Sequence, residues 1–406
     1  MFACSAMASS NKAYFSPVNL RVIMLGNKAL SLLFLCLLCS GLGAQHSDSA
    51  KPGLVRRYWD AFFHDTSSAA DPQLLIYPTL GFAPETSWEI GFSTLYVYYA
   101  QRDTNNRLSE VSGFTFYTLE DQFGLWFDHA LYGHRDKWFF LGRTRLQSFP
   151  LLYFGQGPDA PAEFQALVEG NYLLWQERVL RRIRPNFFGG LNLDFQQLSA
   201  VNFKGNEGPY VGERPRGAEG SRNLGLGLAL VYDNRHNVLN VREGFFSELS
   251  FLQYDRLWGS DFEFTRLTSD TRWFHRVNRK DVFAAQVFGQ FTPQGRPPFN
   301  QLALMGGENL MRGYYLGRYR DRNLLAAQVE YRSLPLPFAK RLGAAAFVAA
   351  GQVFPDAQHL RMDAFLPTAG LGLRYLIFFQ KDINVRLDCA FTREGMGVYF
   401  FIGEAF

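Results

Sequence analysis

The sequence predicts an all-β fold, a transmembrane antiparallel β-barrel of about sixteen strands with a long inward-folded loop and a short N-terminal amphipathic helix. Three observations support this fold class. Apolar and polar residues alternate along many segments of strand length. The apolar faces are rich in aromatic side chains, and Phe, Trp and Tyr make up 16% of the chain. An apolar outer band with aromatic girdles and a polar lumen is typical of outer-membrane barrels.

The N-terminal segment has the order of charged, apolar and small residues that is typical of a secretory signal. Lys28 precedes an apolar run at 29–38, and small residues follow it up to Ala44. About ten apolar residues are too few for a spanning helix. We therefore predict a signal peptide at 1–44, with Met24 as an alternative start of the chain.

Three of the four cysteines, Cys4, Cys36 and Cys39, lie in this removable segment. A lipid-attachment site at Cys39 is the weaker alternative, because the preceding Leu38 is bulky. The mature chain keeps Cys389 alone, so we expect no internal disulfide even in an oxidising compartment. Cys389 is in phase with apolar residues of its strand, which favours a lipid-facing side chain over a reactive thiol.

Residues 45–72 are predicted to be a short periplasmic segment with one amphipathic helix, because their apolar residues recur at helical spacing. These residues are Leu54, Val55, Tyr58, Trp59, Phe62 and Phe63. The helix would lie at the periplasmic membrane interface or plug the mouth of the barrel. The segment leaves no room for a separate soluble domain.

Sixteen strand-like segments follow within the predicted barrel, 73–406. They lie at 74–83, 88–99, 110–119, 123–132, 136–147, 164–179, 184–198, 223–233, 244–254, 262–275, 280–292, 323–333, 341–353, 369–378, 382–391 and 396–403. A single-chain bacterial barrel requires an even number of strands, and short connectors alternate here with longer ones, as periplasmic turns and outer loops do. Lipid offers no water to an open sheet edge, so the sheet must close.

Composition argues against several other functions. A net charge of +4 is too modest to indicate a nucleic-acid partner. None of the seven histidines sits in a recognisable catalytic motif, and no cysteine-histidine cluster suggests zinc. We therefore expect no enzymatic activity, no cofactor and no metal.

The longest interruption between strand-like segments runs from Pro293 to Arg322, and loops of this length in compact proteins are usually functional or disordered. Its glycines and aromatic residues do not suggest disorder. Four signatures accompany it in order. They are Met311-Arg312-Gly313-Tyr314; Tyr153 to Asp159; a turn motif with Asp233 and Arg235; and a C-terminal set of Glu330, Arg332, 347–351, Gly370, Gly372, Arg374, Arg386, Asp388 and Phe406.

In this order and spacing, the signatures resemble the BamA/TamA family of outer-membrane assembly barrels, also called bacterial surface antigens, over 74–406. The resemblance implies that the loop bearing Arg312, Gly313 and Tyr314 folds into the lumen. Glu330 is then the natural partner of Arg312, because strand parity points it inward and arginine binds carboxylates through two parallel hydrogen bonds. A wet lumen would keep this pair well under the roughly 3–5 kcal/mol of a buried bridge.

Two alternatives accompany these site predictions. Arg312, Arg318, Arg320 and Arg322 could instead form a basic outer loop that touches lipopolysaccharide phosphates. The other inward residues are expected to fill the wide lumen with a mixed-charge network rather than to recognise a substrate. That network comprises Arg332, Arg374, Arg386 and Asp388.

The sequence also departs from the family pattern. Ala349 occupies a position that is usually acidic, so we expect Arg312 to lose one of two wall partners. Phe406 resembles the family's C-terminal assembly signal, although Glu404 before it is unusually polar. We expect no counterpart here of the soluble periplasmic domains that full-length members carry.

The resemblance implies insertion or translocation of proteins or lipids at the bacterial outer membrane. Implied partners are outer-membrane lipids, lipopolysaccharide, and client outer-membrane proteins or other assembly subunits. The first and last strands, near 74–83 and 396–403, would meet at a weak seam, and residues near Ile76 and Phe400 would face each other across it. The alternative is a passive pore or an accessory barrel without insertase activity, because a fold alone does not establish function.

Overall fold

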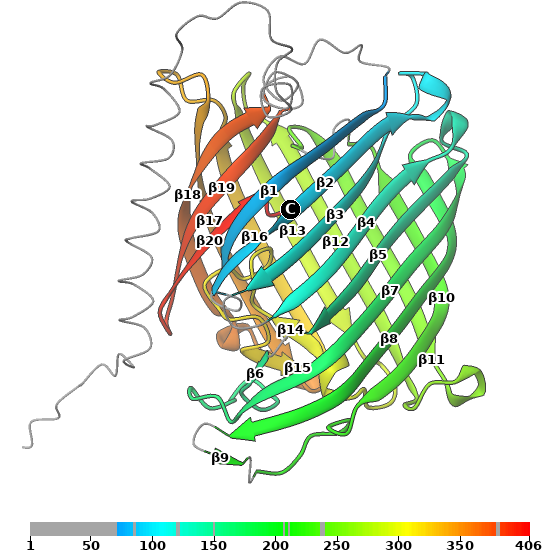
Figure 1. Ribbon diagram of the computed structural model, residues 1–406, viewed down its shortest axis with the longest axis vertical. Helices are drawn as coiled ribbons and strands as arrows, with labels where there is room; N and C mark the ends of the chain where they lie inside the picture. Colours follow the sequence, from blue (N-terminus) through cyan, green and yellow to red (C-terminus); the bar gives the residue numbers. More distant parts are fainter. Residues whose placement is uncertain are drawn as a thin grey trace, which may run out of the picture. The chain divides into compact units, whose positions relative to one another are not determined.

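The computed structural model describes residues 71–406 except 84–86, 119–121, 149–150, 206–207, 210–211, 236–239 and 379–381. These residues belong to the second of two compact units, Phe62–Phe406. They form a large antiparallel sheet that curves into a barrel wall (Figure 1). The predicted signal peptide and amphipathic helix lie outside the described residues.

Sixteen long strands follow one another around this sheet within the described residues. They are β1 Gln73–Ala83, β2 Ser87–Tyr99, β3 Leu108–Thr118, β4 Phe123–Tyr132, β5 Trp138–Ser148, β7 Ala166–Arg184, β8 Phe187–Gly205, β10 Ser221–Asp233, β11 Gly244–Tyr254, β12 Phe264–Arg276, β13 Asp281–Phe291, β16 Asn323–Ser333, β17 Leu342–Phe354, β18 Leu366–Phe378, β19 Ile383–Thr392 and β20 Met396–Ile402. The short strands β6 Leu151–Tyr153 and β9 Gly208–Pro209 extend the sheet to eighteen. The predicted fold class is confirmed.

The remaining elements are short. β14 Ala303–Met305 and β15 Tyr319–Asp321 pair with each other in a separate two-stranded sheet. The 3₁₀ helices are η1 Ala100–Arg102, η2 His134–Asp136, η3 Arg256–Trp258, η4 Phe299–Gln301, η5 Ala357–His359 and η6 Met362–Ala364. None of the helices in the described part of the chain is long and apolar enough to cross a membrane.

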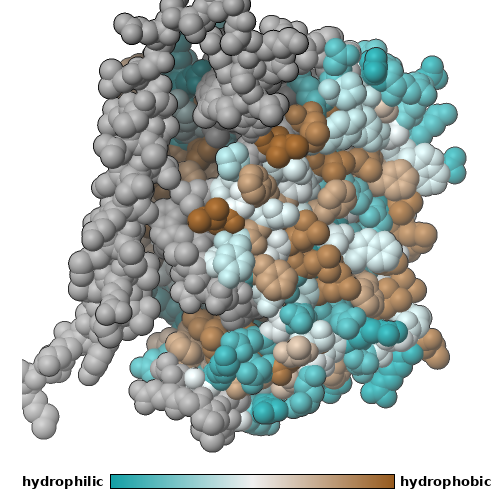
Figure 2. Space-filling view, viewed as in Figure 1, coloured by the Kyte–Doolittle hydropathy of each residue, from teal (hydrophilic) through white to brown (hydrophobic). Residues whose placement is uncertain are grey.

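Period-two alternation places the two faces of each strand as expected. In β16, Tyr331 is 42% exposed on the outer face, while its neighbours Glu330 and Arg332 are buried on the inner face. The visible outer surface carries apolar and aromatic side chains across its middle and hydrophilic side chains toward both ends (Figure 2). This distribution suits lipid contact in the middle and water at the rims.

Two strands are longer than the sequence indicated. β7 and β8 each span 19 residues, so both extend past the predicted ends at 179 and 198. Their pairing contains register shifts between Glu169 and Asn171 and between Arg182 and Arg184. A bulge shifts the phase of alternation, which hides such a continuation from a periodicity argument.

The first and last strands meet at a weak seam. Among the described residues, β1 pairs with β20 through Phe82 and Phe400 alone, whereas it pairs with β2 along its whole length. A continuous ladder therefore does not close the barrel. The prediction that Ile76 faces Phe400 is wrong, because Ile76 lies six positions before Phe82, roughly 20 Å along the strand.

The chain leaves the last strand before it ends. β20 stops at Ile402, and Gly403 adopts a positive φ of 87°, a conformation that glycine reaches without strain. Phe406 is buried among lumen-facing side chains that include Phe274 and Ala284. Phe406 therefore lies inside the barrel and not on β20, and its role as an assembly signal stays a prediction.

A polar pair interrupts the apolar outer face. His129 Nε2 lies 3.2 Å from Glu177 Oε1, and these residues share the outer face with Phe127 and Trp175 two positions away. Both pair in register with Gly142 of the strand between them. A Cβ atom at Gly142 would lie 2.1 Å from the imidazole and 2.5 Å from the carboxylate. The missing side chain thus lets the pair meet across β5.

Candidate functional site

The interruption at 293–322, hereafter the lumen loop, folds into the barrel. It leaves β13, forms η4 and the β14–β15 hairpin, and returns to β16. Met305, Met311, Tyr314 and Tyr319 of this loop are buried in one cluster with wall residues of β16 and β17. This apolar contact with the inner wall holds the loop inside the lumen.

The tip of the loop depends on glycine at Gly313. Its φ is +102°, and a Cβ atom there would lie 2.6 Å from Thr392 Cγ2 of the wall. The Gly313 N–H donates to the hydroxyl of Tyr399 on β20 at 2.9 Å. The adjacent Tyr314 is 1% exposed and donates its hydroxyl proton to the Pro367 carbonyl at 3.1 Å. The residues flanking Arg312 therefore contact the last strands of the barrel.

Arg312 binds two carboxylates on the inner wall. Its Nη2 lies 2.5 Å from Glu330 Oε2, and its Nη1 lies 2.5 Å from Asp388 Oδ2. The guanidinium carbon is also 3.5 Å from the centroid of the Phe347 ring, a cation–π arrangement. The basic outer-loop alternative does not describe this geometry, since Arg312 points into the barrel.

The expected loss of a wall partner at Ala349 does not occur. Ala349 packs in the apolar cluster that contains Met311, and Asp388 of β19 supplies the second carboxylate instead. The second carboxylate that binds Arg312 therefore comes from β19 and not from β17, where Ala349 lies.

Further arginines bind the same carboxylates and form what we call the wall network: Arg312, Glu330, Arg332, Arg374, Arg386, Asp388 and Glu404. Arg332 and Arg374 contact Glu330 at 2.9 and 3.0 Å. Arg374 and Arg386 contact Asp388 at 2.5 and 3.0 Å. Glu404, beyond the last strand, accepts from Arg374 Nε at 3.0 Å.

The network is closed to bulk solvent, contrary to the wet lumen that we expected. The side chains of Arg312, Glu330, Arg332, Arg374 and Asp388 are 0% exposed. Solvent therefore does not screen these pairs, and removing one charge from a buried cluster is expected to cost about 3–5 kcal/mol when it leaves an opposite charge uncompensated. Four arginines bind three side-chain carboxylates, and Arg332 also donates to a main-chain oxygen of Phe406 at 3.1 Å.

The second signature, Tyr153 to Asp159, lies against the base of the lumen loop. Gly157 N–H donates to the Arg320 carbonyl at 2.8 Å, and Gln156 Nε2 donates to Asp321 Oδ1 at 3.0 Å. Arg320 in turn donates to the Leu152 carbonyl at 3.1 Å. Two signatures that are far apart in the sequence therefore form one contact in the lumen.

The other arginines of the lumen loop also have hydrogen-bond or ion-pair partners. Arg318 is 4% exposed, donates to Glu394 Oε2 at 2.7 Å and lies over the Phe154 ring. Tyr319 donates its hydroxyl to the same carboxylate, and burial, together with this hydrogen bond, raises the pKa of Tyr319. Burial lowers the pKa of Arg320 to about 10, which still leaves it cationic at neutral pH. Arg322 is partly exposed and faces Asp356 at 3.8 Å.

The turn motif lies apart from the wall network. Arg235 binds Asp233 through Nε and Nη2 at 3.0 and 2.9 Å and stacks 4.4 Å above the Phe246 ring. Asp233 N–H also donates to the Asn186 carbonyl of a neighbouring turn. The contacts connect adjacent turns.

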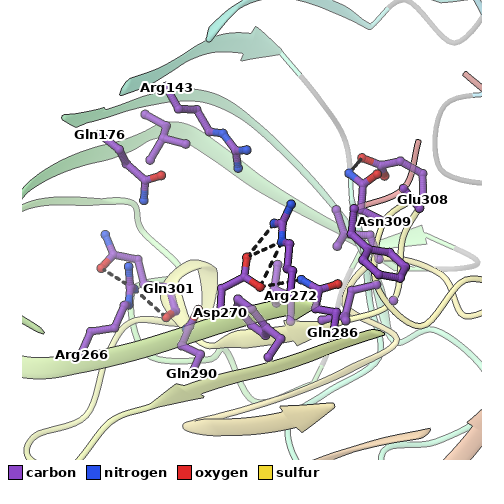
Figure 3. Close-up of a pocket in the computed structure, with 18 of the residues that line it drawn as sticks. Arg143, Gln176, Arg266, Asp270, Arg272, Gln286, Gln290, Gln301, Glu308 and Asn309 are labelled. Atoms are coloured by element: carbon purple, nitrogen blue, oxygen red, sulfur yellow. Dashed lines mark hydrogen bonds and ion pairs between the residues drawn. The ribbon is translucent and has the colours of Figure 1, made fainter. Parts of the chain in front are cut away.

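A cavity of about 700 Å³ adjoins the lumen loop. Figure 3 shows Arg143 and Gln176 on one wall, Arg266, Asp270 and Gln290 on another, and Asn309 of the loop at its side. Its polar lining suits water or a polar solute. Within the described residues, no group of three or more His, Cys, Asp and Glu side chains could hold a metal ion.

Several contacts with the lumen loop could not be predicted from the local sequence. Tyr399, Thr368 and Glu394 bind the lumen loop, and strand parity indicates only that Tyr399 and Thr368 point inward. The sequence analysis identified Glu404 only as unusually polar and did not predict its ion pair with Arg374.

An antiparallel barrel with a lumen loop bound to its inner wall defines an outer-membrane β-barrel with an internal obstruction. Residues 165–406 match the Omp85 superfamily domain. The chain belongs to this superfamily and is an outer-membrane protein, and the predicted resemblance to BamA/TamA barrels is confirmed.

Solved structures with low sequence identity share the fold. BamA from Haemophilus ducreyi lacking POTRA domains 1-3 is 13% identical with a TM-score of 0.53, over 82% of this chain and 70% of that one. CdiB from Acinetobacter baumannii is 13% identical with a TM-score of 0.51, over 82% and 59%. CdiB from Escherichia coli is 10% identical with a TM-score of 0.52, over 82% and 67%. No curated protein matches the sequence.

Proposed function

We propose that this barrel inserts or translocates polypeptides at the outer membrane by opening between β1 and β20. The observation that supports this proposal is the seam, where one residue pair joins the two strands while β1 and β2 pair along their whole length. Strand edges with unpaired N–H and C=O groups recruit further strands. An incoming polypeptide could therefore pair with an edge exposed at the seam.

The lumen loop has a defined part in this proposal. Its tip contacts the last three strands, through Thr368 on β18, Asp388 on β19 and Tyr399 on β20. These contacts brace the β20 side of the seam, whereas none of them involves β1. We therefore expect β1 to move when the seam opens, while β18 to β20 stay bound to the loop.

The second candidate is a passive pore or accessory barrel. The polar cavity of about 700 Å³ beside the loop favours it, because a polar lumen conducts ions when an obstruction moves. A pore needs no opening at the seam, which separates the two proposals experimentally.

A disulfide across the seam tests the proposal. Opposed residues of an antiparallel pair have Cα atoms about 4.5–5.5 Å apart, within the range that a disulfide spans. Phe82→Cys and Phe400→Cys, combined with Cys389→Ala, should therefore form a bond. If the seam opens during function, the oxidised variant should lose activity in cells and regain it on reduction.

The matched control places the same bond elsewhere in the wall. Val329→Cys and Val348→Cys are opposed in the fully paired β16–β17 ladder, where opening is not proposed. This variant should stay active when oxidised. Full activity of the oxidised seam variant, with the bond shown to be formed, would exclude seam opening and favour the pore.

A further inference from the structure

A cluster of basic side chains lies at the end of the barrel where short turns join β4 to β5 and β7 to β8. We call it the turn-end patch, and its exposed members are Arg135, Lys137, Arg181, Arg182 and Arg184. The two turns touch, because Arg182 N–H donates to the Lys137 carbonyl at 3.0 Å. Residues from separate hairpins thus form one continuous basic surface.

The patch keeps its charge. Among the described residues, no carboxylate forms an ion pair with any member of the patch, and the nearby Asp136 is held by Arg107 at 3.5 Å. At the opposite end of the barrel, three exposed arginines pair with acids. Those pairs are Arg214–Glu219 at 2.7 Å, Arg256–Glu263 at 3.9 Å and Arg361–Asp363 at 2.5 Å.

Large apolar side chains border the patch on the outer face. Trp138 is 44% exposed and Ile183 is 59% exposed. Trp138 pairs in register with Arg181, whose guanidinium lies 5.9 Å from the indole centroid. An interfacial tryptophan beside cationic side chains is typical of the level where lipid headgroups meet the acyl chains.

We propose that the turn-end patch binds the headgroup of an anionic phospholipid. Arginine binds phosphate oxygens through paired N–H donors, while Trp138 and Ile183 would contact the upper acyl chains. Short turns of outer-membrane barrels face the periplasm, so the ligand belongs to the periplasmic leaflet. Binding of an acidic protein would require only the basic side chains of the patch. The adjoining apolar residues on the lipid-facing side favour a lipid as the ligand. This inference does not depend on the proposed function.

Brominated lipids provide the test, because bromine quenches the fluorescence of a neighbouring tryptophan. A variant that keeps Trp138 and carries Phe at the other tryptophans is reconstituted in phosphatidylcholine vesicles that contain brominated phosphatidylglycerol or brominated phosphatidylcholine. One additional contact between a basic side chain and an anionic headgroup corresponds to roughly a fivefold preference for phosphatidylglycerol over phosphatidylcholine. We expect at least that preference for phosphatidylglycerol around Trp138, decreasing with added salt.

Two variants with the same charge change locate the effect. Arg181→Gln, Arg182→Gln and Arg184→Gln together should bring the two brominated lipids to equal quenching. Arg214→Gln, Arg256→Gln and Arg361→Gln, at the opposite end, should leave the preference intact. Native mass spectra of the unaltered chain and of both triple variants, mixed with each lipid, give the same comparison if the single-tryptophan chain does not fold.

Equal quenching by both lipids in the unaltered patch would overturn the proposal. A preference that survives the Arg181, Arg182 and Arg184 substitutions would also overturn it, because the lipid would then bind elsewhere. Absence of headgroup preference together with binding of an acidic periplasmic protein would assign the patch to a protein partner instead.

Discussion

The ion pairs of the wall network predict an asymmetry between its members. Without Arg312, Glu330 still binds Arg332 and Arg374, and Asp388 still binds Arg374 and Arg386. Arg312→Met should then cost about 1–3 kcal/mol for the lost charge-assisted hydrogen bonds. Asp388→Asn instead removes the carboxylate that Arg312, Arg374 and Arg386 share, so it should cost about 3–5 kcal/mol.

The two substitutions can be compared through the urea midpoint of unfolding in detergent micelles and through the temperature at which the folded, fast-migrating gel band disappears. The double variant removes Arg312 together with the Asp388 carboxylate that it binds, so it should be more stable than the two separate losses would predict. Asp194→Asn, in a buried pair with Arg266 remote from the network, controls for the general cost of a buried carboxylate. An Arg312→Met variant that is as unstable as Asp388→Asn would refute this reasoning from the remaining ion pairs.

Three further outcomes follow from the geometry. Gly313→Val should displace the loop tip, because its side chain has no space against the wall, and should raise conductance in planar bilayers; unchanged conductance would mean that the tip stays in place. Deleting 306–320 should raise conductance more, whether the protein is an insertase or a pore. Gly142→Ala should separate His129 from Glu177 and lower stability by about 1 kcal/mol in urea titrations, whereas replacing both His129 and Glu177 by Leu should not destabilise the barrel.

Alternation alone determined most of the wall. A strand turns successive side chains to opposite faces, so the inward positions of Glu330, Arg332 and Arg374 follow from local sequence. The sixteen strands follow for the same reason. The extra length of β7 and β8 did not, because a bulge shifts the phase at the point where those strands continue.

The lumen loop shows where local reasoning ends. Its inward path was implied by the family resemblance of Arg312-Gly313-Tyr314, while the arginines of the loop left a basic outer loop as the alternative. The second carboxylate, Asp388, lies 76 positions from Arg312. Which acid a long side chain meets depends on where the loop tip contacts the inner wall of the barrel.

The seam and the chain end were likewise decided by the tertiary structure. The family resemblance implied that β1 and β20 meet at a weak seam. It did not indicate that Phe82 is the residue opposite Phe400, nor that Gly403 turns Phe406 into the lumen. Alternation is a property of each strand by itself, whereas the register across the seam sums the stagger of every strand pair around the barrel.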